Sequence, residues 1–218
     1  MTDDQRFKEW GEQIWTMYDH ITTADLSRRI HNEVGAILRD NPRLRRNNNS
    51  FYGWMASIYE DSVLVAVRRQ VDTDKRSISL VLLLKEISCY PHILSRERFV
   101  RQAVADPLKA SEGAANHMFD HYTAPGANHI NADVVSDEVC DLQARTEPIR
   151  EYTNKRVAHF DKKGPEDSPT VLQVHAALDH LYVLMEKYLL LLRAVKYEKL
   201  QLPDEEGWKD IFRTPWIP

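Results

Sequence analysis

Apolar residues recur every three or four positions along most of this chain, which is the period of an amphipathic helix. Residues 6–20 keep this spacing, and a second stretch with the same spacing covers residues 24–39. The residues Asn41 and Pro42 and the run of three asparagines at 47–49 then interrupt the pattern. It resumes over residues 50–71. We therefore predict two helices before the asparagine run and one long helix after it.

A short turn at residues 72–75 separates this long helix from a Leu-rich run, SISLVLLLKEISCY, that begins at Ser77. Ser77 is a suitable N-cap residue, because a serine hydroxyl accepts a hydrogen bond from a free backbone N–H of the first turn. The run would also suit a buried strand, since periodicity does not separate the two for a short apolar segment. We interpret it as a helix.

The middle of the chain is less regular. A short helix is expected from Arg96 to about Val104. The residues from there to Asn131 include two prolines and two glycines, which predict a long loop or a frayed helical insertion. A further helix is expected over residues 132–145, and Pro148 either opens or kinks its continuation through residues 149–161.

The final helix follows a loop at residues 162–169 and is expected to reach about Leu200, with Ser168 or Thr170 as its cap. Apolar residues surround most of its circumference, so it should be buried on several sides. The covering surfaces are either neighbouring helices or a second copy of the chain. Residues 201–218 are expected to form an irregular tail.

Composition supports an all-α fold. The 218 residues are 43% hydrophobic, enough for a substantial core, and only 7 are glycine and 10 proline. We predict an all-α helical bundle at residues 50–200, with a helical extension at 1–49 packed on it and the tail at 201–218. No apolar run is long enough to span a membrane. The isolated Cys89 and Cys140 and the charged N-terminus lead us to expect a cytoplasmic protein.

A net charge of −4 gives the chain no overall attraction to nucleic acid, so any such binding must come from local patches. Two basic patches are present. The first, at residues 28–46, is most simply a solvated face; its bases are Arg28, Arg29, Arg39, Arg43, Arg45 and Arg46. The second, at residues 150–163, is the stronger candidate for a binding surface because it contains His159.

His159 is the candidate functional residue. On a helix, Asn154, Lys155 and Arg156 lie within a turn and a half of it, so an imidazole that titrates near neutrality would stand in a positive field. Such a group could hold or activate a phosphodiester. Alternatively, the histidine ends a surface helix and hydrogen-bonds a nearby carbonyl.

Two segments carry a resemblance to a known family. The segment VRRQVDTDKRSISLVLLLKEI at residues 67–87 and the segment NKRVAHFD at residues 154–161 resemble the HEPN superfamily, in particular its abortive-infection, AbiU-like branch. The resemblance implies an all-α bundle that often dimerises. It also implies that two Arg-x(4 to 6)-His motifs meet across the dimer interface as a metal-independent RNA-cleaving site.

His159 matches the histidine of that motif, but the arginine is missing, because the permitted positions are Asn154, Thr153 and Tyr152. Similar proteins place the arginine where Thr153 stands. Arg156 is the preferred substitute. The predicted catalytic residues are therefore His159, Arg156 and Asn154, without a metal or other cofactor. The predicted RNA-binding residues are Arg150, Lys155, Lys162 and Lys163.

Other candidate residues receive simpler interpretations. His117 and His121, four residues apart with Asp120 between them, could hold a metal, but we interpret them as loop histidines. His175 and His180 are expected to be core or interface histidines, and Arg68, Arg69 and Asp72 to form charge pairs at a helix end.

Three functions remain open. They are an endoribonuclease of a prokaryotic defence or toxin–antitoxin type, a catalytically inactive module that binds RNA, a nucleotide or a protein, and a helical scaffold without a ligand. The expected partners are a second copy of the chain, RNA or a nucleotide, and an antitoxin-like protein.

Overall fold

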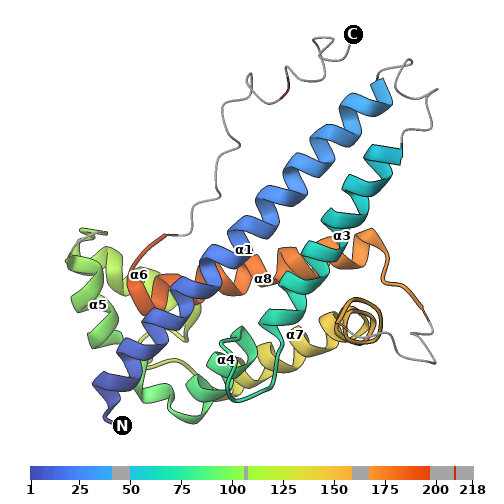
Figure 1. Cartoon of the computed structure of the whole chain (residues 1–218). Coiled ribbons are helices and arrows are strands. Elements are labelled where there is room, and N and C mark those ends of the chain that lie inside the picture. Colours follow the sequence, from blue (N-terminus) through green and yellow to red (C-terminus); the bar gives the residue numbers. More distant parts are fainter. Residues whose placement is uncertain (41–49, 106–107, 159–166, 197–208, 210–218) are drawn as a thin grey trace.

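The computed structural model describes residues 1–40, 50–105, 108–158, 167–196 and Lys209. These residues form helices and loops and no strand, which confirms the predicted all-α bundle (Figure 1). The elements are α1 (Asp3–Asp40), α3 (Ser50–Gln70), α4 (Leu80–Cys89), η1 (Pro91–Ile93), α5 (Arg96–Val104), α6 (Glu112–Tyr122), α7 (Ala132–Tyr152), the π-helical turn η2 (Thr153–Ala158) and α8 (Val171–Arg193).

The N-terminal residues form one helix, so the prediction of two helices was wrong. The threonines between the two predicted stretches do not interrupt α1, because their hydroxyls bond to carbonyls of the preceding turn. Thr22 donates to the carbonyl of Tyr18 and Thr23 to that of Asp19, each at 2.8 Å. Trp10 and Ile14 of α1 are fully buried in the core that the other helices share.

Helix α8 lies at the centre of the bundle and is covered mainly by α1, α7 and α3. Its residues Leu181, Met185 and Leu189 are fully buried, whereas Val183 is exposed. Neighbouring helices of the same chain therefore account for most of its apolar circumference. Thr170 caps α8 through a reciprocal pair of bonds with Gln173. The helix ends at Arg193, not near Leu200, because Ala194 adopts a left-handed conformation with φ of 49°.

The helices between α1 and α8 follow the predictions with two changes. Helix α4 begins after Ser79 and not after Ser77, since the Ser79 hydroxyl accepts the N–H of Leu82. The region expected to be a loop or a frayed insertion contains a regular helix, α6, capped by Ser111. Helix α5 matches its predicted bounds.

The C-terminal part of α1 and the N-terminal part of α3 run side by side and project beyond the other helices (Figure 1). We call this pair, residues 27–40 and 50–62, the arm. Its surface is apolar for an exposed element, since Phe51, Trp54 and Ile58 are all about half exposed. A groove of about 420 Å³ runs between its two helices, lined by residues that include Ile30, Val34 and Met55. The part of the chain that is described leaves this groove open.

Candidate functional site

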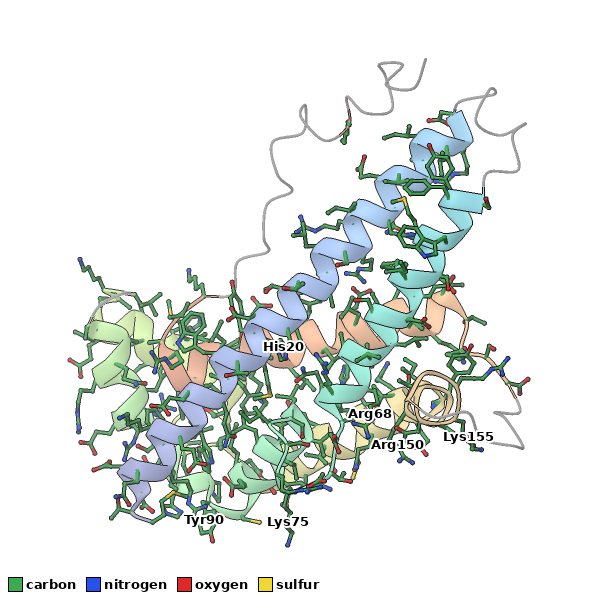
Figure 2. The ribbon with its side chains drawn as sticks, viewed as in Figure 1. His20, Arg68, Lys75, Tyr90, Arg150 and Lys155 are labelled. Carbon is green, nitrogen blue, oxygen red and sulfur yellow. The ribbon has the colours of Figure 1, made fainter. Side chains whose placement is uncertain are left out.

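The two segments that carry the family resemblance meet in space. Arg68, near the end of α3, donates from Nε to the side-chain oxygen Oδ1 of Asn154 in η2 at 2.9 Å. Arg68 and Asn154 are 86 positions apart in the chain. Figure 2 shows Arg68 and Lys155 at the same end of the bundle, where α3 passes the end of α7.

Arg68 is held on its other side by Asp72. Its Nη1 donates to Oδ2 of Asp72 at 2.6 Å, which confirms the predicted helix-end charge pair for Arg68 and Asp72. Ser77 donates to the same carboxylate at 3.2 Å, and the hydroxyl of Ser79 donates to the backbone carbonyl of Asp72 at 2.6 Å. The turn between α3 and α4 thus fixes the guanidinium that holds Asn154.

Asp72 carries its negative charge down to acidic pH. Its partial burial raises the pKa of this carboxyl, but the hydrogen bonds from the Asp74 backbone, Arg68 and Ser77, together with the charge of Arg68, outweigh that effect. The pKa of Asp72 therefore lies below its ordinary value, and the pair with Arg68 is ionised at neutral pH.

Helix α7 carries a buried stripe that reaches the start of the second segment. Its buried residues form a stripe at steps of three and four that continues to Thr153; the stripe consists of Val135, Val139, Leu142, Thr146, Ile149 and Thr153. Pro148 is exposed and lies within α7 without ending it, because water can bond the carbonyl that its missing N–H leaves free.

Thr153, the position where the resemblance places an arginine, is only 1% exposed. Its hydroxyl donates to the carbonyl of Ile149 at 2.7 Å. The side chain is therefore part of the core, and it does not replace the missing cation. From Thr153 onward the backbone follows a π-helical turn, and such turns often occur at functional sites.

The predicted RNA-binding cations are only partly available. Arg150 pairs with Glu147 at 2.6 Å, and Lys155 pairs with Glu151 at 2.5 Å, so neighbouring carboxylates offset both charges. Arg156 is exposed in η2, and we find no ion-pair partner for it among the described residues. The predicted catalytic His159 and the predicted RNA-binding Lys162 and Lys163 lie outside the described residues.

The first basic patch contains a network of ion pairs around the buried carboxylate of Asp25. Arg28 donates to Asp25 and to Asp179 of α8, each at 2.7 Å, and Arg29 lies 3.2 Å from the second oxygen of Asp25. Arg28 therefore joins α1 to α8. Because Arg28 and Arg29 are largely covered and paired with carboxylates, the interpretation of this patch as a solvated face was wrong for these two residues. Arg43, Arg45 and Arg46 lie outside the described residues.

His117 and His121 lie in helix α6, so their interpretation as loop histidines was wrong, whereas His175 and His180 contact neighbouring helices. Asp120, between His117 and His121, accepts from Arg96 at 2.5 Å and from the backbone of Gly126 at 3.1 Å. Nε2 of His180 lies 3.3 Å from Asp141, and Nε2 of His175 lies 2.9 Å from the hydroxyl of Tyr59. No group of three or more potential ligands that could hold a metal ion occurs within the described residues.

The contact between Arg68 and Asn154 was not predicted from the sequence. Arg68 was interpreted only as a helix-end partner of Asp72, although it belongs to one of the two segments that carry the resemblance. That shared membership was the available signal. The contact could not be predicted from the two segments alone, because it depends on how α3 packs against the end of α7.

Comparison with known protein families gives one match. The family model HEPN_AbiU2, described as AbiU2, matches residues 20–211. The all-α fold and this match define a HEPN-like protein associated with abortive infection. The chain belongs to the AbiU2 family of HEPN proteins. Searches of curated proteins and of solved structures returned no match. Within the described residues, no helix is both long and apolar enough to cross a bilayer.

Proposed function

We propose that this protein binds single-stranded RNA at the end of α7, and that it cleaves the bound RNA slowly without a metal ion. The contact between Arg68 and Asn154 is the observation that carries the proposal, because it brings the two family segments into one site. Asn154 is held from the α3 side, and Arg156 is exposed two residues further along.

In the proposed reaction, the ribose 2′-oxygen attacks the adjacent phosphorus and the bond from phosphorus to the 5′-oxygen breaks. His159 accepts the proton of the 2′-hydroxyl, water gives a proton to the leaving 5′-oxygen, and Arg156 binds the scissile phosphate. Asn154, held by Arg68, orients the RNA backbone. Lys162 and Lys163 contribute further phosphate contacts, and Lys155 and Arg150 do so in competition with Glu151 and Glu147. Slow cleavage is expected because Thr153 is buried and cannot offer the donor that the motif's arginine would provide. The loss of one such donor typically lowers the rate by ~10²- to 10³-fold.

A cleavage assay in the presence of a chelator tests this proposal. We expect the full chain to cleave a labelled single-stranded RNA slowly, and His159→Ala to abolish cleavage while leaving the RNA bound. Arg156→Ala should weaken both binding and cleavage. If the His159→Ala variant cleaves at the wild-type rate, or if the wild-type chain binds no RNA at low salt, the proposal is wrong.

A second candidate function is protein interaction, and the arm favours it. Exposed apolar groups of this size on a projecting element commonly mark contact surfaces. We propose that a second copy of the chain covers the arm, which would make the protein a homodimer. An antitoxin-like protein is the alternative occupant.

Sedimentation at micromolar concentration separates these possibilities. A homodimer should sediment at about twice the chain mass of 25.4 kDa. Trp54→Glu should convert it to a monomer, whereas Arg69→Glu, at an exposed position of the same helix outside the arm, should not. If the wild-type chain is monomeric at all concentrations, the homodimer proposal is wrong.

A further inference from the structure

A small cavity lies between α3, the end of α7 and the start of α8. Its volume is about 180 Å³, and the residues around it include Tyr59, Glu60, Val63, Tyr152 and His175. Tyr152 directly precedes the π-helical turn, so the cavity adjoins the proposed RNA site.

The walls combine apolar and aromatic surface with a few polar groups. Val63, Leu64 and Val174 provide the aliphatic surface, and Tyr59 and Tyr152 provide aromatic rings. At one side the hydroxyl of Tyr59 lies 2.9 Å from Nε2 of His175. Mixed walls of this kind suit a planar heteroaromatic ligand, because its faces can stack and its edges can hydrogen-bond.

The Tyr59–His175 pair is uncharged at neutral pH. Burial, followed by the charge of Arg28, lowers the pKa of His175 below its ordinary value of 6.5. Burial raises the pKa of the Tyr59 hydroxyl above 10.0. These two groups can exchange hydrogen bonds with a neutral ligand without adding charge to the cavity.

Glu60, an exposed residue of α3, provides the negative charge among the residues that line this cavity. The described residues that line it include no lysine or arginine, so the cavity offers no cation to a phosphate. The carboxylate of Glu60 accepts hydrogen bonds and repels anions. A ligand that matches this lining is therefore not an anion, and it presents N–H donors to the carboxylate.

We propose that this cavity binds an unpaired guanine base of the single-stranded RNA whose backbone contacts the π-helical turn. The inference rests on the proposed function for the backbone contact. Guanine presents two adjacent donors on its Watson–Crick edge, N1–H and the 2-amino group, which match the two oxygens of one carboxylate. Adenine and cytosine each present a single donor group at that edge. Unpaired bases in RNA are commonly recognised in this way, by stacking and edge contacts.

Binding of short RNAs tests this inference. Fluorescence anisotropy would be measured with labelled RNA pentamers that carry guanine, inosine or adenine at the central position and adenine elsewhere. We expect the guanine pentamer to bind about tenfold or more tightly than the adenine pentamer. Inosine lacks the 2-amino group and should bind with intermediate affinity.

Two matched variants test whether Glu60 is the source of the preference for guanine. Glu60→Gln should remove most of the preference for guanine, because an amide offers only one acceptor at that position. Asp61→Asn removes the same charge at the next residue of α3, which is also exposed but is not among the residues that line the cavity, and should leave the preference unchanged.

The outcomes for the two proposals are distinguishable. If all pentamers bind equally and salt weakens them equally, the guanine inference is wrong and the proposed function stands. If the preference survives Glu60→Gln, the cavity is not its source and the inference is also wrong. Calorimetry with free guanosine tests the case in which no RNA binds. If guanosine binds and loses affinity in Glu60→Gln while no RNA binds, the base cavity stands and the proposed function fails.

Discussion

Arg68 of α3 donates a hydrogen bond to Asn154 of the π-helical turn, at 2.9 Å. The bond joins the segment that ends α3 to the segment that follows α7. With Asp72 on its other side, Arg68 forms a bridge from the α3–α4 turn to the proposed RNA site. The position of Asn154 therefore depends on a side chain from a distant part of the sequence.

Removing this bridge should destabilise the fold. Arg68→Ala leaves Asp72 and Asn154 without their shared donor, and we expect a loss of about 1 to 3 kcal/mol in the free energy of unfolding. Arg69→Ala is the control, because Arg69 is exposed on the same turn; we expect a change within about 0.5 kcal/mol. Urea unfolding of both variants measures the difference. Equal stability of the two variants would show that the bridge contributes nothing.

The Asp72 carboxyl should make stability depend on pH in the acidic range. Its pKa is depressed in the folded state, so its contribution is present above the ordinary value of 3.8 and is lost as pH falls through the lower folded value. We expect wild type to exceed Asp72→Asn in stability at about pH 5, and the gap to close toward about pH 2. Unfolding curves across this range, with Asp61→Asn as the control, provide the test. A gap that is constant with pH would rule out this linkage.

A buried ionic cluster joins α7 to α8. Lys187, whose side chain is 8% exposed, donates to Glu138 at 2.6 Å, and the hydroxyl of Tyr188 donates to the other carboxylate oxygen, also at 2.6 Å. Glu138→Leu leaves a buried ammonium unpaired, which should cost about 3 to 5 kcal/mol. Adding Lys187→Met and Tyr188→Phe removes the unpaired groups and should recover most of that loss. Thermal unfolding compares the two variants, and the absence of recovery would contradict the explanation.

The sequence predicted most helices, because their apolar spacing and capping residues are local signals. The predictions were wrong where side-chain hydrogen bonds decide whether a helix continues or where it begins. The predicted break in α1 is absent because Thr22 and Thr23 bond within the helix. The cap of α4 is Ser79, since Asp72 engages Ser77 through its side chain. These bonds form only once the helix and the turn are in place.

The candidate site was predictable only in part. The spacing of residues 149–161 indicated a basic turn, but it did not show that Thr153 continues the buried stripe of α7. Arg150 and Lys155 were both expected to bind RNA, whereas Glu147 and Glu151 offset their charges in the fold. The cavity beside the turn joins residues from three helices, so no local pattern could indicate it.

The salt dependence of RNA binding tests the central claim most directly. The logarithm of the association constant for a labelled single-stranded RNA falls linearly with the logarithm of salt concentration, with a slope of about −0.7 for each phosphate that a cation neutralises. The double variant Lys155→Ala, Arg156→Ala should bind more weakly, and its slope should be shallower by about 0.7 for each phosphate that is no longer neutralised. The control double variant Lys8→Ala, Arg101→Ala removes two exposed cations from α1 and α5. We expect it to keep the wild-type slope. An unchanged slope in the first variant, or an equal change in the control, would contradict RNA binding at the end of α7.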